Sequence, residues 1–369
     1  MKILFLGDYS NLHGTLSTYL RGHGHEVTLV SDGCRCMDLE SDIRLARRRG
    51  LFSGYDYLYK IMNLMPRLAG YDVVQLINPH FFSLKPGKLI YFFKELARQN
   101  GSMFLSLAGN DHFFVRQCVL GEMFRFSEFR VGKELTPLVQ RNPDHEAGYL
   151  LPSVRNFSQD LYGRLDGAMA VLPEYDMAAR PELGDRLVFT NLPVDLAELQ
   201  PLPFNLDGKV RILVGMRSEN IDSKGTSVLL EAAKIAEKRL PDRVEAMNVR
   251  DLPWRQYKEA LGTAHVVLDQ LYSYSPGMNG LSTMALGRVA GTGAQPEYYE
   301  YLEEKTRPIF ELSPQSAEEI AARLCDLVTD PDRLKSMAAE GRRLVERHND
   351  VAVVAKRYLD HWENTLNRK

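Results

Sequence analysis

The sequence predicts an α/β protein with two Rossmann-like, parallel-sheet domains that face a central cleft. Two strand–loop–helix units, in which a glycine closes the strand, lie about 200 residues apart; one starts at Met1 and the other at Val210. A chain of 369 residues also exceeds what a single hydrophobic core usually serves. Both observations indicate one βα-type domain in each half of the chain.

The first domain is expected to cover residues 1–200. Short apolar runs between turn residues predict buried parallel strands, and longer amphipathic segments predict helices. The expected strands are 2–6, 26–30, 72–77, 103–107 and 168–172, and the expected helices are 15–22 and 86–99. Gly7 and Gly14 flank the first loop, where glycine lets the backbone approach a ligand closely. The loop lacks the G-x-G-x-x-G spacing of a dinucleotide site, so a nicotinamide cofactor is poorly supported.

Residues 44–62 combine cations with aromatic side chains. Arginines at 44 and 47–49 are followed by an apolar stretch with tyrosines at 55, 57 and 59. Such a segment can touch a lipid headgroup or an anionic acceptor. The alternative is a solvated helix end next to a core helix. The expected partners therefore include a weak peripheral contact with a membrane.

The second domain is expected over residues 206–350. It follows a linker at 201–205, where closely spaced prolines and a polar tail end regular structure. The expected strands are 210–214, 244–249 and 265–269, and the expected helices are 226–239, 254–261, 278–287, 315–329 and 331–347. A last helix, 351–366, carries an apolar stripe of Val351, Val354, Tyr358 and Trp362, which is suited to docking on another element.

The composition is that of an ordinary globular protein. With 46 basic and 48 acidic residues the net charge is −2, so there is no global attraction to nucleic acid or to an anionic membrane. Cys34, Cys36, Cys118 and Cys325 are too few and too scattered for a disulfide framework, and their spacing fits no zinc site. No secretion signal and no apolar run of about 18 residues is visible. The expected location is the cytoplasm, including the inner face of the membrane.

Arg217 and Lys224 form a candidate anion site. They lie between the strand that ends at Gly215 and the helix that begins at Thr226, whose N-terminal N–H groups and dipole favour an anion. Arginine supplies a planar fork for phosphate oxygens, and lysine supplies a mobile point charge. Together they are expected to hold a diphosphate without a metal ion, for example that of a sugar nucleotide. The alternative is a pair of solvated loop cations.

Four acidic or basic side chains are candidates for contact with a substrate. Asp111 and His112 follow the strand 103–107 at the carboxyl edge of the sheet, where open α/β folds bind ligands. They are the candidate catalytic residues, because a carboxylate or an imidazole can bind or deprotonate an acceptor hydroxyl. The alternatives are a turn cap for Asp111 and core packing for His112. Asp269 is a candidate contact for the donor sugar, and the alternative is that it caps a turn. Glu297 is a candidate contact for a sugar or ribose, and the alternative is that it is an acidic residue in the first turn of a helix.

Several short motifs follow one another along nearly the whole chain. They are G-H-E-V at 24–27, G-x-D at 109–111, N-L-P-V-D at 191–195, G-x-R at 215–217, K-G at 224–225, M-A-L-G-R at 284–288 and R-H-N-D at 347–350. In this order and spacing they resemble the GT-B fold glycosyltransferases, in particular the GT4-like group (glycosyl transferases group 1).

The resemblance implies where the substrates bind. In that family the nucleoside-diphosphate-sugar donor lies mainly on the C-terminal domain, and the acceptor lies on the N-terminal domain. It places Arg217 and Lys224 on the donor phosphates, where fixed cations act on the charge that grows as the diphosphate leaves. No metal ion is then required. The last helix of similar proteins crosses back to the N-terminal domain, so residues 351–369 are expected there.

The sequence also departs from the family pattern. Similar enzymes carry two glutamates in an E-x7-E arrangement, one toward the donor sugar and one toward the ribose. Alignment on Gly277 and the motif that follows it puts Tyr274 and Ser282 at these two places. Both side chains can hydrogen-bond hydroxyls, but neither is an ionised acceptor. Ala108 stands where a histidine often precedes the G-x-D turn, and His112 is expected to fill the same space.

Residues and resemblance together predict a glycosyltransferase without a bound cofactor. It would move a sugar from a nucleoside-diphosphate-sugar donor to a glycan or lipid-linked acceptor, in surface polysaccharide or glycoconjugate synthesis. The resemblance favours retention of anomeric configuration. One rival is a non-catalytic GT-B-fold protein that binds a sugar nucleotide or a partner enzyme, suggested by Tyr274 and Ser282. The other is a nucleotide-sugar epimerase, which would consume the donor without an acceptor.

Overall fold

The computed structural model describes residues 1–33, 39–47, 50 and 52–368. The predictions for Cys34, Cys36 and the arginines at 48 and 49 fall outside these residues. Cys118 and Cys325 are thiols. The chain forms two compact units: the first contains Met1–Arg116, Glu146–Pro193 and Val351–Lys369, and the second contains Gln117–His145 and Val194–Asp350.

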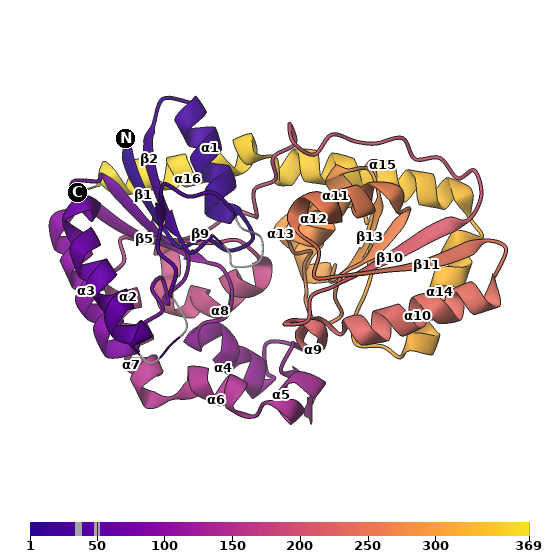
Figure 1. The fold of residues 1–369 in the computed structure, drawn as a ribbon, viewed down its shortest axis with the longest axis horizontal. Coiled ribbons are helices and arrows are strands. Elements are labelled where there is room, and N and C mark those ends of the chain that lie inside the picture. The colour runs from indigo at the N-terminus through magenta and orange to yellow at the C-terminus, as the bar shows by residue number, and fades with distance from the viewer. Residues whose placement is uncertain (34–38, 48–49, 51, 369) are drawn as a thin grey trace. The chain divides into compact units, whose positions relative to one another are not determined.

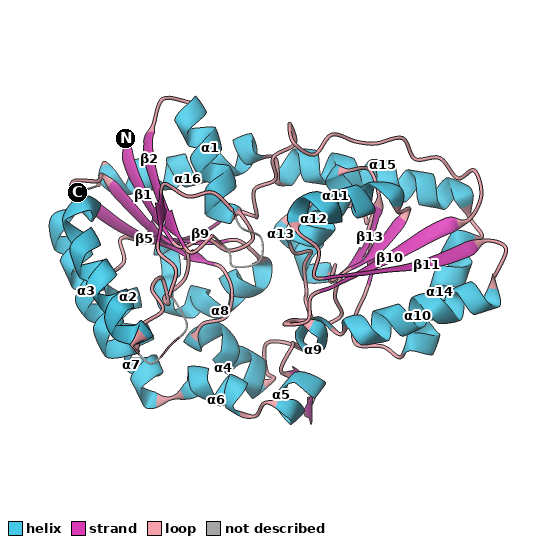
Figure 2. Cartoon of the chain, in the orientation of Figure 1, coloured by secondary structure: helices cyan, strands magenta, loops and turns pink. Residues whose placement is uncertain are grey.

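The first unit is built on a seven-stranded parallel sheet with the order β3-β2-β1-β4-β5-β8-β9 (Figures 1 and 2). Ile3 of the inner strand β1 lies opposite Val27 on one side and Val73 on the other. Such apolar runs form strands that are buried on both faces, as parallel sheets require. The strands are β1 (Lys2–Leu6), β2 (Glu26–Ser31), β3 (Ile43–Arg44), β4 (Val73–Leu76), β5 (Ser102–Leu107), β8 (Gly167–Ala170) and β9 (Leu187–Phe189).

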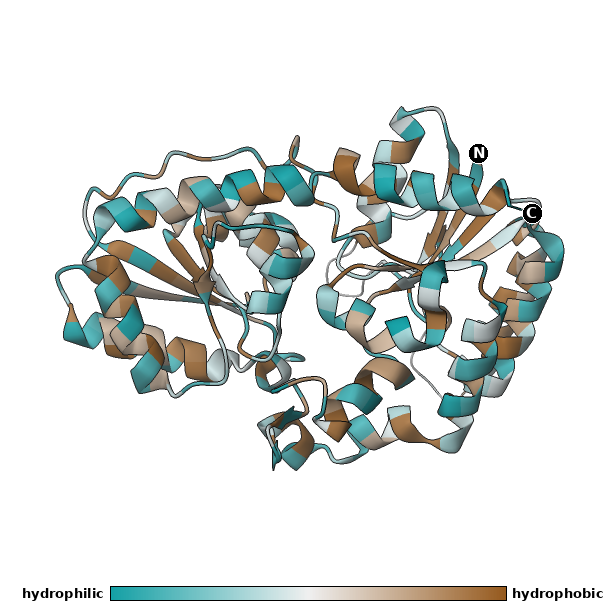
Figure 3. Ribbon diagram, turned by 180° about the vertical axis from the view of Figure 1, so that it is seen from behind, coloured by the Kyte–Doolittle hydropathy of each residue, from teal (hydrophilic) through white to brown (hydrophobic). Residues whose placement is uncertain are grey.

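Helices lie against the sheet of the first unit, and the apolar segments of their ribbons are brown in Figure 3. The buried apolar side chains of these helices contribute to the core of the unit. The helices are α1 (Leu12–Gly22), α2 (Ser53–Leu64), η2 (Met65–Leu68), α3 (Pro86–Gln99), α7 (Pro152–Arg164), α8 (Pro173–Leu183), η3 (Gly184–Arg186) and α16 (Val351–Leu366). Helices α4 (His112–Leu120) and α6 (Asp144–Leu150) begin in one unit and end in the other.

The second unit holds a five-stranded parallel sheet with the order β11-β10-β12-β13-β14. Its strands are β10 (Val210–Met216), β11 (Val244–Arg250), β12 (Val266–Leu268), β13 (Val289–Thr292) and β14 (Phe310–Glu311). Its helices are α9 (Ile221–Lys224), α10 (Thr226–Arg239), α11 (Trp254–Thr263), α12 (Met278–Ala285), α13 (Pro296–Tyr301), α14 (Ala317–Val328) and α15 (Pro331–His348). Residues 117–145, assigned to the first domain by sequence, add β6 (Arg130–Val131), β7 (Glu134–Leu135) and α5 (Pro137–Arg141) to this unit.

The segment predicted as a linker, 201–205, is bonded to the second unit. The backbone N–H of Leu202 donates to the Leu286 carbonyl at 3.1 Å, and the Arg288 guanidinium donates to the Pro203 carbonyl at 2.9 Å. The His265 Nε2 donates to the Asn205 carbonyl at 2.7 Å. The chain therefore passes between the units earlier than predicted, after Pro193, and returns after Asp350.

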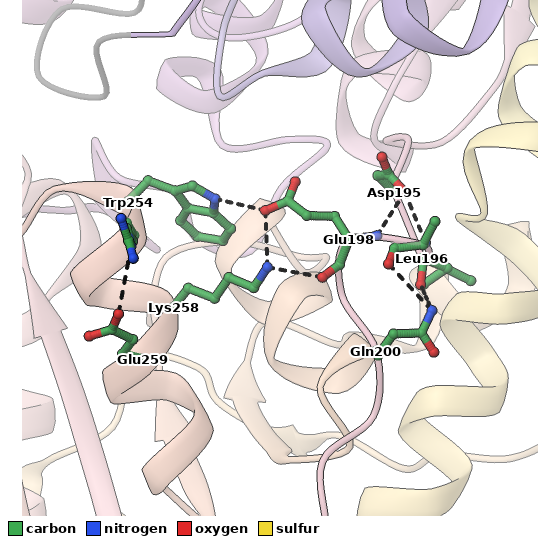
Figure 4. A network of polar contacts seen from close by, with 9 residues as sticks. Asp195, Leu196, Glu198, Gln200, Trp254, Lys258 and Glu259 are labelled. Carbon is green, nitrogen blue, oxygen red and sulfur yellow. Dashed lines mark hydrogen bonds and ion pairs between the residues drawn. The ribbon is translucent and has the colours of Figure 1, made fainter. Parts of the chain in front are cut away.

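Residues 195–200 are also held on the second unit, through the α11 helix (Figure 4). The Glu198 carboxylate accepts the indole N–H of Trp254 at 3.3 Å and the Lys258 ammonium at 3.2 Å. Asp195 accepts the backbone N–H of Glu198 at 3.0 Å, which closes a turn in front of these contacts. Trp254 and Lys258 thus fix the residues that directly follow the passage of the chain into the second unit.

A buried polar network joins the last helix to the sheet of the first unit. The His13 Nδ1 donates to the Gly7 carbonyl at 2.7 Å, so its Nε2 accepts the hydroxyl of Ser106 at 3.1 Å. The Gln75 amide donates to the same Ser106 oxygen at 3.0 Å, and the Trp362 indole donates to the Gln75 carbonyl at 3.0 Å. These side chains are at most 1% exposed. Helix α16 is therefore part of the core of this unit, packed against α1 and β8.

The burial of His13 predicts a loss of stability in mild acid. Desolvation lowers the pKa of His13 from 6.5 to about 3, so the folded protein keeps it neutral while the unfolded chain takes up a proton below pH 6.5. Stability present above pH 6.5 is then lost as the pH falls toward 3, by about 1.4 kcal/mol per pH unit for one proton. We expect this contribution to appear in urea unfolding between pH 6.5 and 4 as a difference in slope between the native protein and a variant without the imidazole.

A His13→Asn variant isolates this effect. Burial raises the pKa of Asp8 to about 6, so Asp8 makes stability fall as the pH rises between 3.8 and 6, which opposes the His13 effect. The variant keeps Asp8 but has no imidazole, so its stability should fall less on acidification than that of the native protein. Parallel curves for the two proteins would show that His13 does not stay neutral in the folded state.

Candidate functional site

The second unit presents a loop between β10 and α10 at the carboxyl edge of its sheet. Gly215 near the end of β10 has no space for a side chain, because a Cβ would lie 2.3 Å from the Tyr257 hydroxyl. Gly225, with φ +67, turns the chain from α9 into α10, and a Cβ there would meet Leu271 at 2.8 Å. Both glycines therefore let the loop pack closely on neighbouring side chains.

Lys224 is held at this edge by a buried carboxylate. Its ammonium donates to the Asp269 Oδ1 at 2.7 Å, and the Asn279 amide donates to the same oxygen at 2.9 Å. The Tyr257 hydroxyl in turn donates to the Asn279 carbonyl oxygen at 2.9 Å. The Asp269 side chain is 3% exposed, whereas that of Lys224 is 32% exposed. The cation thus reaches solvent from a position that a buried acid fixes.

Arg217 lies within electrostatic reach of the same cluster. The pKa of Tyr257 is raised, first by burial and then by the Asp269 carboxylate, while the Arg217 guanidinium lowers it. Arg217 is half-buried, and its carbonyl accepts the backbone N–H of Asn220 at 2.9 Å. The structure therefore brings Lys224 and Asp269 into contact, and Arg217, which the sequence also singled out, lies in the same loop. Tyr257 and Asn279, which support them, carried no sequence signal.

Tyr274 is engaged by the segment 117–145. The backbone N–H of Arg125 donates to the Tyr274 hydroxyl at 2.6 Å, and the Arg125 guanidinium lies 4.9 Å from the centre of its ring. The same guanidinium donates to both oxygens of Glu297, at 2.5 and 3.0 Å, which lowers the pKa of that carboxyl. Tyr274 is buried, with 3% exposure. The acceptor oxygens expected to face a sugar or ribose thus have partners within the protein.

The other two predicted residues of this region are Gly277, directly before α12, and Ser282, within that helix. Gly277 is the N-cap residue of the helix, in extended backbone. Ser282 is 2% exposed, and its carbonyl accepts the backbone N–H of Leu286 at 3.1 Å. Helix α12 packs against α15 and β13, which accounts for the burial of Ser282.

In the first unit, Gly7 and Gly14 are each in close contact with a side chain of the protein itself. Gly7 has φ +82, and a Cβ there would lie 2.3 Å from Ile77. At Gly14 a Cβ would lie 2.1 Å from the Asn11 side chain, and the Gly14 N–H donates to Asp8 at 3.2 Å. The close approach predicted for these glycines is therefore made by neighbouring segments of the chain.

Asp111 and His112 are both buried, at 5% and 4% exposure. Asp111 accepts the backbone N–H of Phe114 at 2.8 Å, which caps α4, and also the hydroxyl of Tyr162. Burial raises its pKa. The His112 Nδ1 donates to the Tyr149 carbonyl at 2.9 Å. The cavity beside Asp111 measures about 10 Å³, which is the size of one water at most.

A larger pocket opens nearby in the same unit. It has a volume of about 490 Å³ and is lined by Tyr9, Asn78, His80, Asn110, Gly148, Tyr149 and Val154. Burial lowers the pKa of His80, so its imidazole is neutral near pH 7. The rings of His80 and Tyr149 meet edge to face, with centres 6.3 Å apart. Sequence reasoning missed this pocket, although Asn78 and His80 directly follow a predicted strand.

Over residues 1–33, 39–47, 50 and 52–368 no group of three or more histidine, cysteine, aspartate or glutamate side chains is placed to hold a metal ion. No helix in this part of the chain is both long enough and apolar enough to cross a bilayer.

Comparison with known proteins identifies the fold of the chain. No protein-family model matches the chain, and no curated protein matches it in sequence. Its structure is similar to sucrose-phosphate synthase from Thermosynechococcus elongatus, with a TM-score of 0.68, 14% identity and 100% of both chains covered. It is also similar to Anabaena HepE in complex with UDP and glucose, with a TM-score of 0.62, 12% identity and 99% and 100% of the two chains covered.

A third similar structure is WaaG, a glycosyltransferase involved in lipopolysaccharide biosynthesis. The TM-score is 0.57 at 13% identity, and 96% of this chain and 98% of WaaG are covered. These proteins are GT-B glycosyltransferases, and the two parallel sheets with their helices match them over the full length. The chain therefore has the GT-B fold, as the sequence predicted.

Proposed function

We propose that this protein is a glycosyltransferase that takes a sugar from a nucleoside-diphosphate-sugar donor. The observation that carries the proposal is Lys224, an ammonium fixed by the buried Asp269 at the carboxyl edge of the second sheet, with Arg217 in the same loop. Open parallel sheets bind ligands at this edge. A GT-B fold with two cations at this position has the parts that such a transfer requires.

The cations would act on the leaving diphosphate. When the bond between the sugar and the phosphate breaks, negative charge accumulates on the phosphate oxygens, and cations already in place stabilise it without reorganising. Asp269 keeps Lys224 in one position and so supplies that preorganisation. We infer that the reaction needs no metal ion and that it retains the anomeric configuration, as the family resemblance favours.

The acceptor would bind in the pocket of the first unit. A volume of about 490 Å³ falls in the range of small-molecule sites. Its lining of tyrosine rings, side-chain amides and a neutral imidazole suits a saccharide, whose apolar faces lie on rings and whose hydroxyls bond amides. We therefore favour a glycan acceptor, free or lipid-linked, in glycoconjugate synthesis in the cytoplasm. His112 would support the wall of this pocket, because it donates to the carbonyl of Tyr149, whereas Asp111 would hold the start of α4 through its bond to Phe114.

A second candidate function is binding of a sugar nucleotide without transfer. It is favoured by the state of Tyr274, whose hydroxyl already accepts an N–H from the segment 117–145, and by the pairing of Glu297 with Arg125. Neither would then hold the sugar. An epimerase has no such support, since it would need no acceptor pocket.

The test is a thermal-shift screen of nucleoside diphosphates and their sugars, followed by calorimetry on each hit. UDP and UDP-glucose come first, because HepE structures contain them. We expect one nucleotide to bind, and its affinity to fall at least tenfold in an Arg217→Ala variant, since one charge-assisted bond contributes about 1.5–3 kcal/mol.

The products then decide between the two functions. Donor consumed only with an added glycan identifies a transferase, and donor bound but never consumed identifies the binding protein. No nucleotide bound at millimolar concentration would contradict both.

A further inference from the structure

One face of α2 in the first unit, together with Phe52 at its N-cap, carries large apolar side chains without a partner among the described residues. Phe52, Tyr55, Tyr59 and Met62 are 77%, 78%, 65% and 59% exposed. Their spacing of three, four and three residues puts them in one row along the helix. Isolated exposed apolar residues are ordinary, but a continuous row marks a surface that contacts another phase or molecule.

The opposite face of α2 holds the helix in the first unit. Tyr57, Ile61 and Leu64 are buried and pack into the core of the first unit, to which α3 also contributes (Figure 1). The Tyr57 hydroxyl accepts the backbone N–H of Ser83 at 3.2 Å. The helix is thus fixed by one face, so the outward row is not needed to hold it in the fold.

Cations border this row. Arg47 approaches Gly54 at the start of α2, and its guanidinium also donates to the Ser83 carbonyl at 3.3 Å. Lys60 lies on the helix and pairs with Asp56 at 2.6 Å. Arg67 follows on η2 and is exposed. Three cations against one carboxylate give the surface a positive sign, although the whole chain has a net charge of −2.

We propose that this face, formed by Phe52, Tyr55, Tyr59 and Met62 with Arg47, Lys60 and Arg67, docks on an anionic lipid bilayer. Tyrosine and phenylalanine favour the headgroup boundary because an apolar ring meets a polar edge there. Bordering cations add attraction to anionic headgroups. A second copy of the chain fits less well, because it would bring three like charges to the same interface. The docking does not depend on the proposed transfer reaction.

The test is co-sedimentation of the full-length protein with vesicles. Vesicles of phosphatidylcholine alone are compared with vesicles that contain about 30% phosphatidylglycerol, at low and high salt. The variant is Tyr55→Ser with Tyr59→Ser, and the control is Leu120→Ser, which alters a 50% exposed apolar residue outside α2. All three substituted side chains are exposed, so the melting temperatures of the variant and the control should match that of the native protein.

We expect binding to the anionic vesicles, weakened by salt, and a partition at least tenfold lower in the tyrosine double variant but unchanged in Leu120→Ser. Equal binding of the double variant, or no binding of the native protein, would overturn the proposal. A dimer in light scattering that the double variant abolishes, without vesicle binding, would assign the face to a second copy instead. Donor binding in calorimetry should be the same for all of these proteins, so failure here leaves the proposed function standing.

Discussion

Replacement of both Arg217 and Lys224 by alanine is expected to abolish sugar transfer. Loss of a single preorganised donor to a developing anion lowers kcat by about 10²–10³, so the double variant should lose at least about 10³ in kcat/KM. The reason is that both cations lie in the loop between β10 and α10 where the diphosphate would leave. The measurement is the initial rate with the donor found in the binding screen.

The controls separate catalysis from folding. Lys224→Ala leaves the Asp269 carboxylate buried, and removal of one partner of a buried ion pair costs up to about 3–5 kcal/mol. The substitution is therefore repeated with Asp269→Asn, which removes the stranded charge, and its rate is compared with that of Asp269→Asn alone. Lys234→Ala with Lys238→Ala removes two exposed cations of α10 as a matched change in charge.

Three outcomes are informative. A full loss in both backgrounds, with unchanged rates for the α10 control, supports a direct role of the two cations on the donor. A loss that disappears once Asp269→Asn is present would show that the effect came from stability. Unchanged turnover of the double variant would refute the mechanism.

The strand–helix order could be predicted from the sequence because it depends on local periodicity. The helix expected at Thr226–Arg239 has these bounds in the structure, and the strand after Met1 ends where Gly7 was expected to end it. Buried parallel strands are continuous apolar runs, and glycine marks their ends. The GT-B assignment followed from the order of short motifs, each of which lies at the end of such an element.

The contacts within the candidate site could not be read in the same way. Arg125 and Glu297 are 172 residues apart, and no local pattern indicates that residues 117–145 join the second unit. Tyr274 was placed correctly in the loop before α12, but the sequence did not show that its hydroxyl would accept an N–H from Arg125. Sequence spacing locates a side chain on an element, whereas tertiary packing decides which partner it has.

The loss of Trp362 is expected to be the largest single effect on stability. The indole is fully buried in α16, donates to Gln75, and lies against the rings of Phe5 and Phe104 at 6.1 and 6.4 Å between centres. Trp362→Ala should lower the free energy of unfolding of the first unit by about 3–5 kcal/mol. Trp362→Phe fills most of the space but leaves the buried Gln75 oxygen without this donor, which should cost about 1–3 kcal/mol.

The two tryptophans allow the effect to be assigned to one unit. Trp254 lies in the second unit, so its fluorescence in Trp362→Ala reports on that unit alone, whereas far-ultraviolet circular dichroism reports on both. Because α16 belongs to the core of the first unit, urea unfolding should show an early transition in dichroism while Trp254 keeps its native midpoint. Glu363→Ala, an exposed change on the same helix, should shift neither by more than about 0.5 kcal/mol. An early transition of Trp254 fluorescence that coincides with the dichroism would mean that the two units unfold together and that α16 supports both.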